Sequence, residues 1–194
     1  MTAYTPEIIR FLNLIPEPFE AIIVCYPRSG STYLGRYMDQ RAMVHLKKSH
    51  ACEVVPGYKI VGTFRKPEES ITSFVSMESY YQNRTDYQVM INKEIAKYNQ
   101  MLDFLIKNAD IMVDYQRMIM APEESIKLVC NALGINVKYH FDYIDQIEDM
   151  PKDKFLKSSK YLKQYRQIEN MVLESDLEAS KNLYSMALKL DKTI

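Results

Sequence analysis

Short apolar runs alternate along the chain with segments in which apolar residues recur every three or four positions. The run at 20–26, EAIIVCY, is rich in β-branched residues and lies between Pro18 and Pro27, which is typical of a buried strand. Similar runs predict three further strands, at 43–50 (MVHLKKSH), 58–64 (YKIVGTF) and 110–115 (DIMVDY).

Helical periodicity fills the segments between and after these strands. Helices are predicted from Ser31 on, from Pro67 on, over 87–107, over 121–134 and over 177–190. Proline suits the first turn of a helix and acidic residues suit its N-terminus, so Pro67, Glu68 and Glu69 mark a helix start. Residues 145–170 are charged and lysine-rich and show no strong period.

This alternation of strands and helices predicts an α/β fold, in which helices cover both faces of a parallel sheet. A chain of 194 residues with 47% hydrophobic residues, 5 glycines and 8 prolines has an ordinary globular composition and suggests one domain. We expect the core of this domain to span about 20–137 and a helical C-terminal extension to cover about 138–194.

Charge and cysteine content narrow the class of protein further. The 25 basic residues balance the 25 acidic ones, which disfavours a dedicated nucleic-acid binder. Cys25, Cys52 and Cys130 lack metal-type spacing, so we expect reduced, buried thiols in a cytoplasmic protein. The N-terminus has no signal-peptide pattern, and no run approaches the roughly 18 apolar residues of a membrane span.

The polar residues that stand out lie at the predicted strand ends, where parallel sheets bind their ligands. Residues 27–32 follow the first strand, Lys48 and His50 end the second, and Arg65 follows the third. Because the carboxyl ends of parallel strands meet at one edge of a sheet, we expect these residues to share one site.

The first of these segments, within YPRSGSTYL (26–34), is a candidate anion-binding loop. Gly30 lets the backbone approach an anion, and N–H groups at the start of the next helix point at it. Further donors are supplied by the side chains of Arg28, Ser31 and Thr32. No lysine follows Gly30 as in triphosphate-binding loops, and Arg65 stands where those proteins have an Asp for Mg²⁺. The loop therefore predicts an anion without a polyphosphate chain and no metal; a plain strand–turn–helix corner is the alternative.

Two other groups of residues suggest chemistry at the same edge. Arg65 and Ser73 lie eight residues apart and could hold a second phosphate, although an ion pair of Arg65 with Glu68 or Glu69 is the alternative. His50 is a candidate general base, since an imidazole titrates near neutral pH, and Lys48 shares its strand face. The alternative is that His50 has only a structural role, and Glu53 is a second candidate for the base. His45 and His140 are taken as structural.

In this order the motifs resemble those of sulfotransferases that use 3'-phosphoadenosine 5'-phosphosulfate (PAPS). YPRSGSTYL is similar to the family's 5'-phosphosulfate loop, FRKPEESITSF to its 3'-phosphate segment, and KKSH to the K-T-H that carries its catalytic histidine. A later segment, DIMVDYQRMIMAPEESIKLVCNALGI, is also similar. The resemblance spans about residues 20–137 and implies a P-loop NTPase-like sheet flanked by helices.

The resemblance also implies a role for each residue. The 5'-phosphosulfate would be held by Pro27, Arg28, Ser29, Gly30, Ser31 and Thr32, with Tyr33 where an aromatic residue is usual. The 3'-phosphate would be bound by Arg65 and Ser73, and the adenine would contact Tyr115. His50 would take the acceptor's proton, Arg28 would stabilise the leaving oxygen, and Lys48 would lie against the sulfonate.

The chain departs from the family in several places. Arg28 replaces a frequent lysine, and Lys66 stands where Asp or Asn is usual. No glycine follows Gly134, so the family's glycine-rich C-terminal segment is missing. Lys157 or Lys160 would supply a replacement cation; a solvated basic helix face is the alternative.

The expected activity is metal-independent, in-line transfer of a sulfonate from PAPS to a hydroxyl, or an amine, of a small-molecule, glycan or lipid acceptor. Two alternatives stay open. One is a non-catalytic module that binds PAPS or another nucleotide, and the other is a P-loop kinase or nucleotide hydrolase that binds Mg·ATP. The acceptor and the oligomeric state are left open by the sequence.

Overall fold

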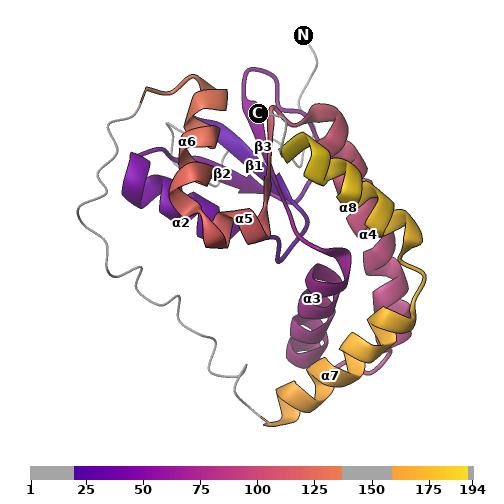
Figure 1. The fold of residues 1–194 in the computed structure, drawn as a ribbon. Helices are drawn as coiled ribbons and strands as arrows, with labels where there is room; N and C mark the ends of the chain where they lie inside the picture. The colour runs from indigo at the N-terminus through magenta and orange to yellow at the C-terminus, as the bar shows by residue number, and fades with distance from the viewer. Residues whose placement is uncertain (1–19, 137–158, 192–194) are drawn as a thin grey trace.

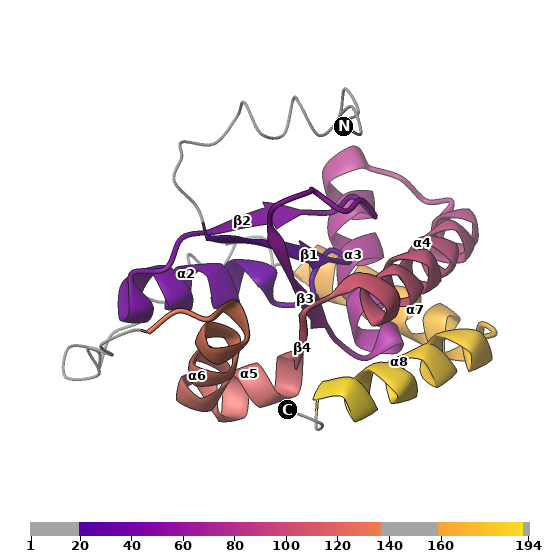
Figure 2. The same cartoon turned by 90° about the horizontal axis from the view of Figure 1, so that it is seen from above.

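The computed structural model describes residues 20–136 and 159–191, which form a four-stranded sheet with helices around it (Figures 1 and 2). The strands are β1 (Ala21–Cys25), β2 (Leu46–Ser49), β3 (Lys59–Phe64) and β4 (Ile111–Asp114). Every pairing is parallel, and the strand order is β2-β1-β3-β4. The predicted α/β class, with a parallel sheet between helices, is confirmed for these residues.

The helices lie on both sides of this sheet (Figure 2). They are α2 (Ser31–Ala42), α3 (Pro67–Gln82), α4 (Tyr87–Asn108), α5 (Tyr115–Met120), α6 (Pro122–Leu133), α7 (Ser159–Glu174) and α8 (Glu178–Asp191). Helices α2, α5 and α6 gather on one side, and α3, α4, α7 and α8 on the other. None of the helices within 20–136 and 159–191 combines the length and the apolar composition needed to cross a membrane.

Alternate residues of β1 point to opposite faces of the sheet, and each face has its own apolar core. Ile22 and Val24 pack in the core shared with α3, α4, α7 and α8. Ala21 and Ile23 pack in the core shared with α2 and α6. Because β1 is buried on both faces, it reads in the sequence as one continuous apolar run.

The C-terminal helices belong to the first of these cores. Ile168 and Val172 of α7 and Ala187 of α8 are fully buried and pack with residues of α3 and α4. The segment expected to be an extension therefore closes one face of the sheet, as far as residues 159–191 are concerned. Residues 137–158, with Lys157 and His140, lie outside the described part of the chain.

Several predicted boundaries differ from the observed ones for local reasons. The strand predicted at 43–50 begins only at Leu46, because Met43 caps α2 in a left-handed conformation with φ 51°. Tyr115 opens helix α5 instead of ending a strand, because the Asp114 carboxylate caps that helix. Helix α7 is not predicted by the sequence pattern, since its buried positions are few and charged residues fill the remaining turns.

Candidate functional site

The loop from Tyr26 to Gly30 joins β1 to α2 and bends sharply at two residues. Gly30 has φ 87° and forms the N-cap of α2, and its carbonyl accepts the N–H of Leu34 at 3.0 Å. Arg28 has φ 68°, a left-handed conformation that side-chain-bearing residues seldom adopt. Such backbone strain persists only where surrounding structure enforces it, and it concentrates at functional sites.

Gly30 is also the point at which another part of the chain comes closest to the loop. A Cβ atom at this position would lie 2.6 Å from Cδ2 of Tyr115 and 2.5 Å from Cε of Met118. The loop and the β4–α5 corner therefore touch through a glycine. Both the backbone conformation and the space around it require that residue.

A pocket of about 260 Å³ opens at this edge of the sheet. Its lining consists of Arg28, Gly30, Ser31, Thr32, Tyr33, Lys48, Arg65 and Tyr115. These residues come from the ends of β1, β2, β3 and β4 and from the start of α2. All eight are among the residues that the sequence suggests for one ligand site.

The pocket is suited to an anion. Three cationic side chains, from Arg28, Lys48 and Arg65, line it, and none of the lining residues carries a carboxylate. The N-terminus of α2 adds backbone donors and the positive end of a helix dipole. Within the described residues, no group of three or more His, Cys, Asp or Glu is arranged to hold a metal ion.

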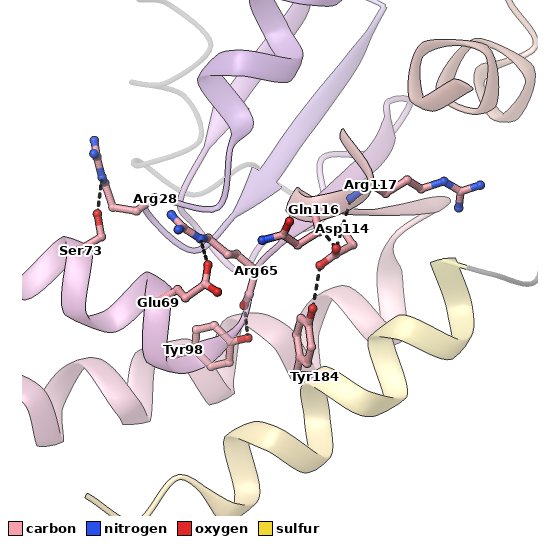
Figure 3. A network of polar contacts seen from close by, with 9 residues as sticks. All are labelled: Arg28, Arg65, Glu69, Ser73, Tyr98, Asp114, Gln116, Arg117 and Tyr184. Atoms are coloured by element: carbon pink, nitrogen blue, oxygen red, sulfur yellow. Dashed lines mark hydrogen bonds and ion pairs between the residues drawn. The ribbon is translucent and has the colours of Figure 1, made fainter. Parts of the chain in front are cut away.

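Arg65 is held in place by two neighbours, Glu69, which Figure 3 shows, and Tyr115. Its Nε donates to Oε2 of Glu69 at 2.7 Å, and its guanidinium lies over the Tyr115 ring, 4.3 Å from the centroid. The ion pair with Glu69 is one of the alternatives that the sequence leaves open. It engages a single N–H of a side chain that has five, so Arg65 can hold Glu69 and still offer donors to the pocket.

Ser73 lies beside Arg28 rather than in the lining of the pocket. The Nε of Arg28 donates to Oγ of Ser73 at 3.1 Å (Figure 3). Within the lining, Nζ of Lys48 donates to Oγ1 of Thr32, also at 3.1 Å. Of the two residues expected to hold a second phosphate, Arg65 lines the pocket, and Ser73 contacts another lining residue, Arg28. Ser73 thus steadies the cation at the tip of the loop.

Ser29 is the one loop residue that is completely enclosed. Its exposed fraction is 0%, and its Oγ has no hydrogen-bond partner among the described residues. Leaving a buried hydroxyl unpaired costs about 1–3 kcal/mol. This serine and the preceding Pro27, both expected to hold the ligand, do not line the pocket.

His50 lies just beyond Lys48, outside the lining of the pocket. Its Nδ1 is 2.8 Å from the carbonyl oxygen of Cys25, at the end of the neighbouring strand. A carbonyl oxygen only accepts, so Nδ1 carries the hydrogen, and Nε2 of the neutral ring keeps its lone pair. The histidine is thus anchored through one nitrogen and has the other available as a base.

The surroundings of His50 favour its neutral form. Although the residue as a whole is exposed, the ring packs closely against the strand end, and this desolvation lowers the pKa of His50. The hydrogen bond to Cys25 opposes the shift, and the positive charge of Lys48 adds to it. Burial raises the pKa of the neighbouring Cys25 thiol, which therefore stays protonated at neutral pH.

Some residues that support the site are not identified by the sequence. Tyr98 of α4 donates to the carbonyl oxygen of Arg65 at 2.6 Å, and Tyr184 of α8 donates to Oδ1 of Asp114 at 3.0 Å (Figure 3). The Asp114–Tyr115 pair carries a readable signal, since an aspartate before a helix is a typical N-cap. The two tyrosines carry none, because they reach the site only through tertiary packing.

No protein-family model matches the chain, and comparisons with curated proteins and with solved structures found no match either.

Proposed function

We propose that this chain is a PAPS-dependent sulfotransferase with a P-loop-type nucleotide site. The observation that carries the proposal is the pocket at the strand ends, where Arg28, Lys48 and Arg65 surround the N-terminus of α2. PAPS carries a phosphosulfate on the 5' carbon and a phosphate on the 3' carbon of one ribose, so it needs two groups of donors separated by that sugar. The loop with Lys48 supplies one group, and Arg65 beside Tyr115 supplies the other.

In this proposal the N–H groups of Gly30 and Ser31 and the hydroxyl of Thr32 hold the 5'-phosphosulfate. Arg65 binds the 3'-phosphate, with Ser73 positioning Arg28, and Tyr115 contacts the adenine. These roles use side chains that already lie within or directly behind the pocket wall.

The transfer step moves one sulfonate and one proton. The acceptor oxygen forms a new bond to sulfur while its proton passes to Nε2 of His50. The bond between sulfur and the bridging oxygen breaks, and its electron pair stays on the phosphate, which leaves 3'-phosphoadenosine 5'-phosphate. Arg28 stabilises the charge on the bridging oxygen, and Lys48 lies against the sulfonate. The acceptor is a hydroxyl, or an amine, of a small molecule, glycan or lipid.

One observation favours a second candidate, a nucleotide-binding module without transferase activity. His50 does not line the pocket, so a bound acceptor has to bring its hydroxyl to the outer side of Lys48. Such a module would bind 3'-phosphoadenosine 5'-phosphate and turn over no acceptor.

We further propose a cytoplasmic location, because the three cysteines are free thiols, as in a reducing compartment.

Calorimetric titration with 3'-phosphoadenosine 5'-phosphate, with and without Mg²⁺, tests the nucleotide site. We expect micromolar, metal-independent binding and a much weaker response to ATP. A preference for Mg·ATP would replace the proposal with a kinase or nucleotide hydrolase. With the site established, an acceptor screen using PAPS separates the transferase from the non-catalytic module.

Replacing Arg65 by alanine should weaken binding of 3'-phosphoadenosine 5'-phosphate by roughly 1.5–3 kcal/mol, the usual contribution of a charged hydrogen bond. This corresponds to an increase in Kd of roughly 10- to 150-fold. Arg84→Ala is a matched control, because Arg84 also pairs with an acidic neighbour, Asp86, but does not line the pocket. Equal affinities of the Arg65 variant and the wild type for this nucleotide would remove Arg65 from the 3'-phosphate site.

A further inference from the structure

We propose that Tyr184, on the C-terminal helix α8, is a positioning residue for this pocket, which acts on Arg65 and Tyr115 through the residues that precede them. The proposal rests on the proposed function in one respect, namely that the pocket binds an anionic ligand. It concerns a helix beyond the segment that resembles a nucleotide site.

Tyr184 touches the last rung of the sheet on two strands at once. Its hydroxyl donates to Oδ1 of Asp114 at 3.0 Å, and its ring meets that of Phe64 edge-on, with centroids 5.6 Å apart. Phe64 and Asp114 are register partners at the ends of β3 and β4. One tyrosine therefore contacts both of the strand ends from which the pocket residues leave.

Both of these residues come directly before a pocket residue. Phe64 precedes Arg65, and Asp114 precedes Tyr115. The Arg65 guanidinium in turn lies over the Tyr115 ring, so the two strand ends meet again inside the pocket. A shift of either end relative to the other would separate this pair.

Asp114 transmits the contact into helix α5. While Oδ1 accepts from Tyr184, Oδ2 accepts the backbone N–H groups of Gln116 at 2.9 Å and of Arg117 at 3.4 Å (Figure 3). Asp114 is 4% exposed, so these bonds are sheltered from water. In the sequence, Tyr115 lies between Asp114, which accepts these hydrogen bonds, and Gln116 and Arg117, which donate them. Its backbone is thereby held at the angle that brings the ring to Gly30 and Arg65.

The hydroxyl of Tyr184 is a permanent donor in this series of contacts. Burial, together with the negative charge of Asp114, raises the pKa of Tyr184, so the hydroxyl keeps its proton at every physiological pH. A second contact ties the same helix to the same corner, since Nη1 of Arg117 donates to the carbonyl oxygen of Asp191 at 2.7 Å and to its Oδ1 at 3.0 Å. Helix α8 is thus hydrogen-bonded to the β4–α5 corner at two residues, Tyr184 and Asp191.

Tyr184→Phe tests this role, because it keeps the ring on Phe64 and removes only the hydroxyl. Ser180→Ala is the matched control on the same helix: it removes a buried hydrogen bond to Asn99 of α4, at 2.6 Å, that does not reach Asp114. Two quantities are measured in full-length wild type and both variants: amide hydrogen exchange at Gln116 and Arg117 by NMR, and calorimetric affinity for 3'-phosphoadenosine 5'-phosphate and for pyrophosphate.

We expect Tyr184→Phe to speed exchange at Gln116 and Arg117 and to weaken binding of both probes roughly three- to tenfold, the effect of about one hydrogen bond. Ser180→Ala should leave the exchange rates and both affinities at wild-type values. The melting temperature, measured alongside, should fall by a similar amount in the two variants, since each loses one hydrogen bond. Unchanged exchange in Tyr184→Phe, or equal changes of exchange and affinity in the two variants, would overturn the proposal.

The two proposals fail in distinguishable ways. If wild type binds pyrophosphate but not the nucleotide, the sulfotransferase proposal fails, and the Tyr184 proposal is judged on pyrophosphate and exchange. If wild type binds neither probe, faster exchange at Gln116 and Arg117 in Tyr184→Phe alone still supports positioning of the corner, and unchanged exchange rejects it.

Discussion

Replacing Gly30 by alanine should abolish measurable binding of 3'-phosphoadenosine 5'-phosphate and destabilise the fold by about 2–5 kcal/mol, the sum of two costs. A left-handed backbone costs a residue with a Cβ about 1–2 kcal/mol. Forcing a methyl group into a filled space costs about 1–3 kcal/mol more. Here the new Cβ would lie 2.6 Å from the ring of Tyr115, so relief of the overlap displaces a pocket residue. Urea unfolding measures the stability, and calorimetry measures the affinity.

Two other glycines separate these contributions. Gly57 has φ +89°, and no described atom lies within 4 Å of the position that a Cβ would take there, so Gly57→Ala should cost only the backbone part. Gly35 lies within α2, and its Cβ would meet Cδ1 of Ile23 at an ordinary 3.6 Å. Gly35→Ala should therefore stabilise the protein by about 0.5–1 kcal/mol. A Gly30 variant that matches Gly57→Ala in stability and binds nucleotide normally would show that contact with Tyr115 is unimportant.

Much of the pocket can be predicted because its residues follow directly from strand ends. A buried parallel strand is a continuous apolar run, and the first polar residues after it must lie at the ligand-binding edge of the sheet. This reasoning identifies Arg28, Lys48 and Arg65, and the structure brings all three to one pocket. Their spacing in the sequence gives no distances, but the topology limits where they can go.

The features that the sequence does not predict depend on helix packing. Side-chain geometry at the start of α3 decides which of Glu68 and Glu69 pairs with Arg65, and the structure pairs it with Glu69. Tyr184 is 70 residues from Asp114, and no local pattern connects them. Helix α7 is hidden because charged residues surround its few buried ones. Pairings of this kind arise only once the elements have packed.

Replacing His50 by asparagine should lower the rate of sulfonate transfer by roughly 100- to 10,000-fold, the usual contribution of a general base. Asparagine can still donate to the Cys25 carbonyl as Nδ1 does, but it has no counterpart of the Nε2 lone pair. The affinity for 3'-phosphoadenosine 5'-phosphate should stay unchanged, since His50 does not line the pocket. Rates are measured with PAPS and the acceptor found by the screen, and affinity by calorimetry.

The pH dependence of the same reaction gives an independent test of His50. Because the pKa of His50 is lowered from 6.5, its basic form persists in mild acid, and the rate should fall only below that pH. His45→Asn is the control: His45 pairs with Asp39 at 2.7 Å beyond the opposite end of β2, and its loss should leave the rate and its pH profile unchanged. If His50→Asn kept both the rate and the acidic limb, the proton would go to another group. Glu53, in the loop that follows His50, would then be the next candidate to replace.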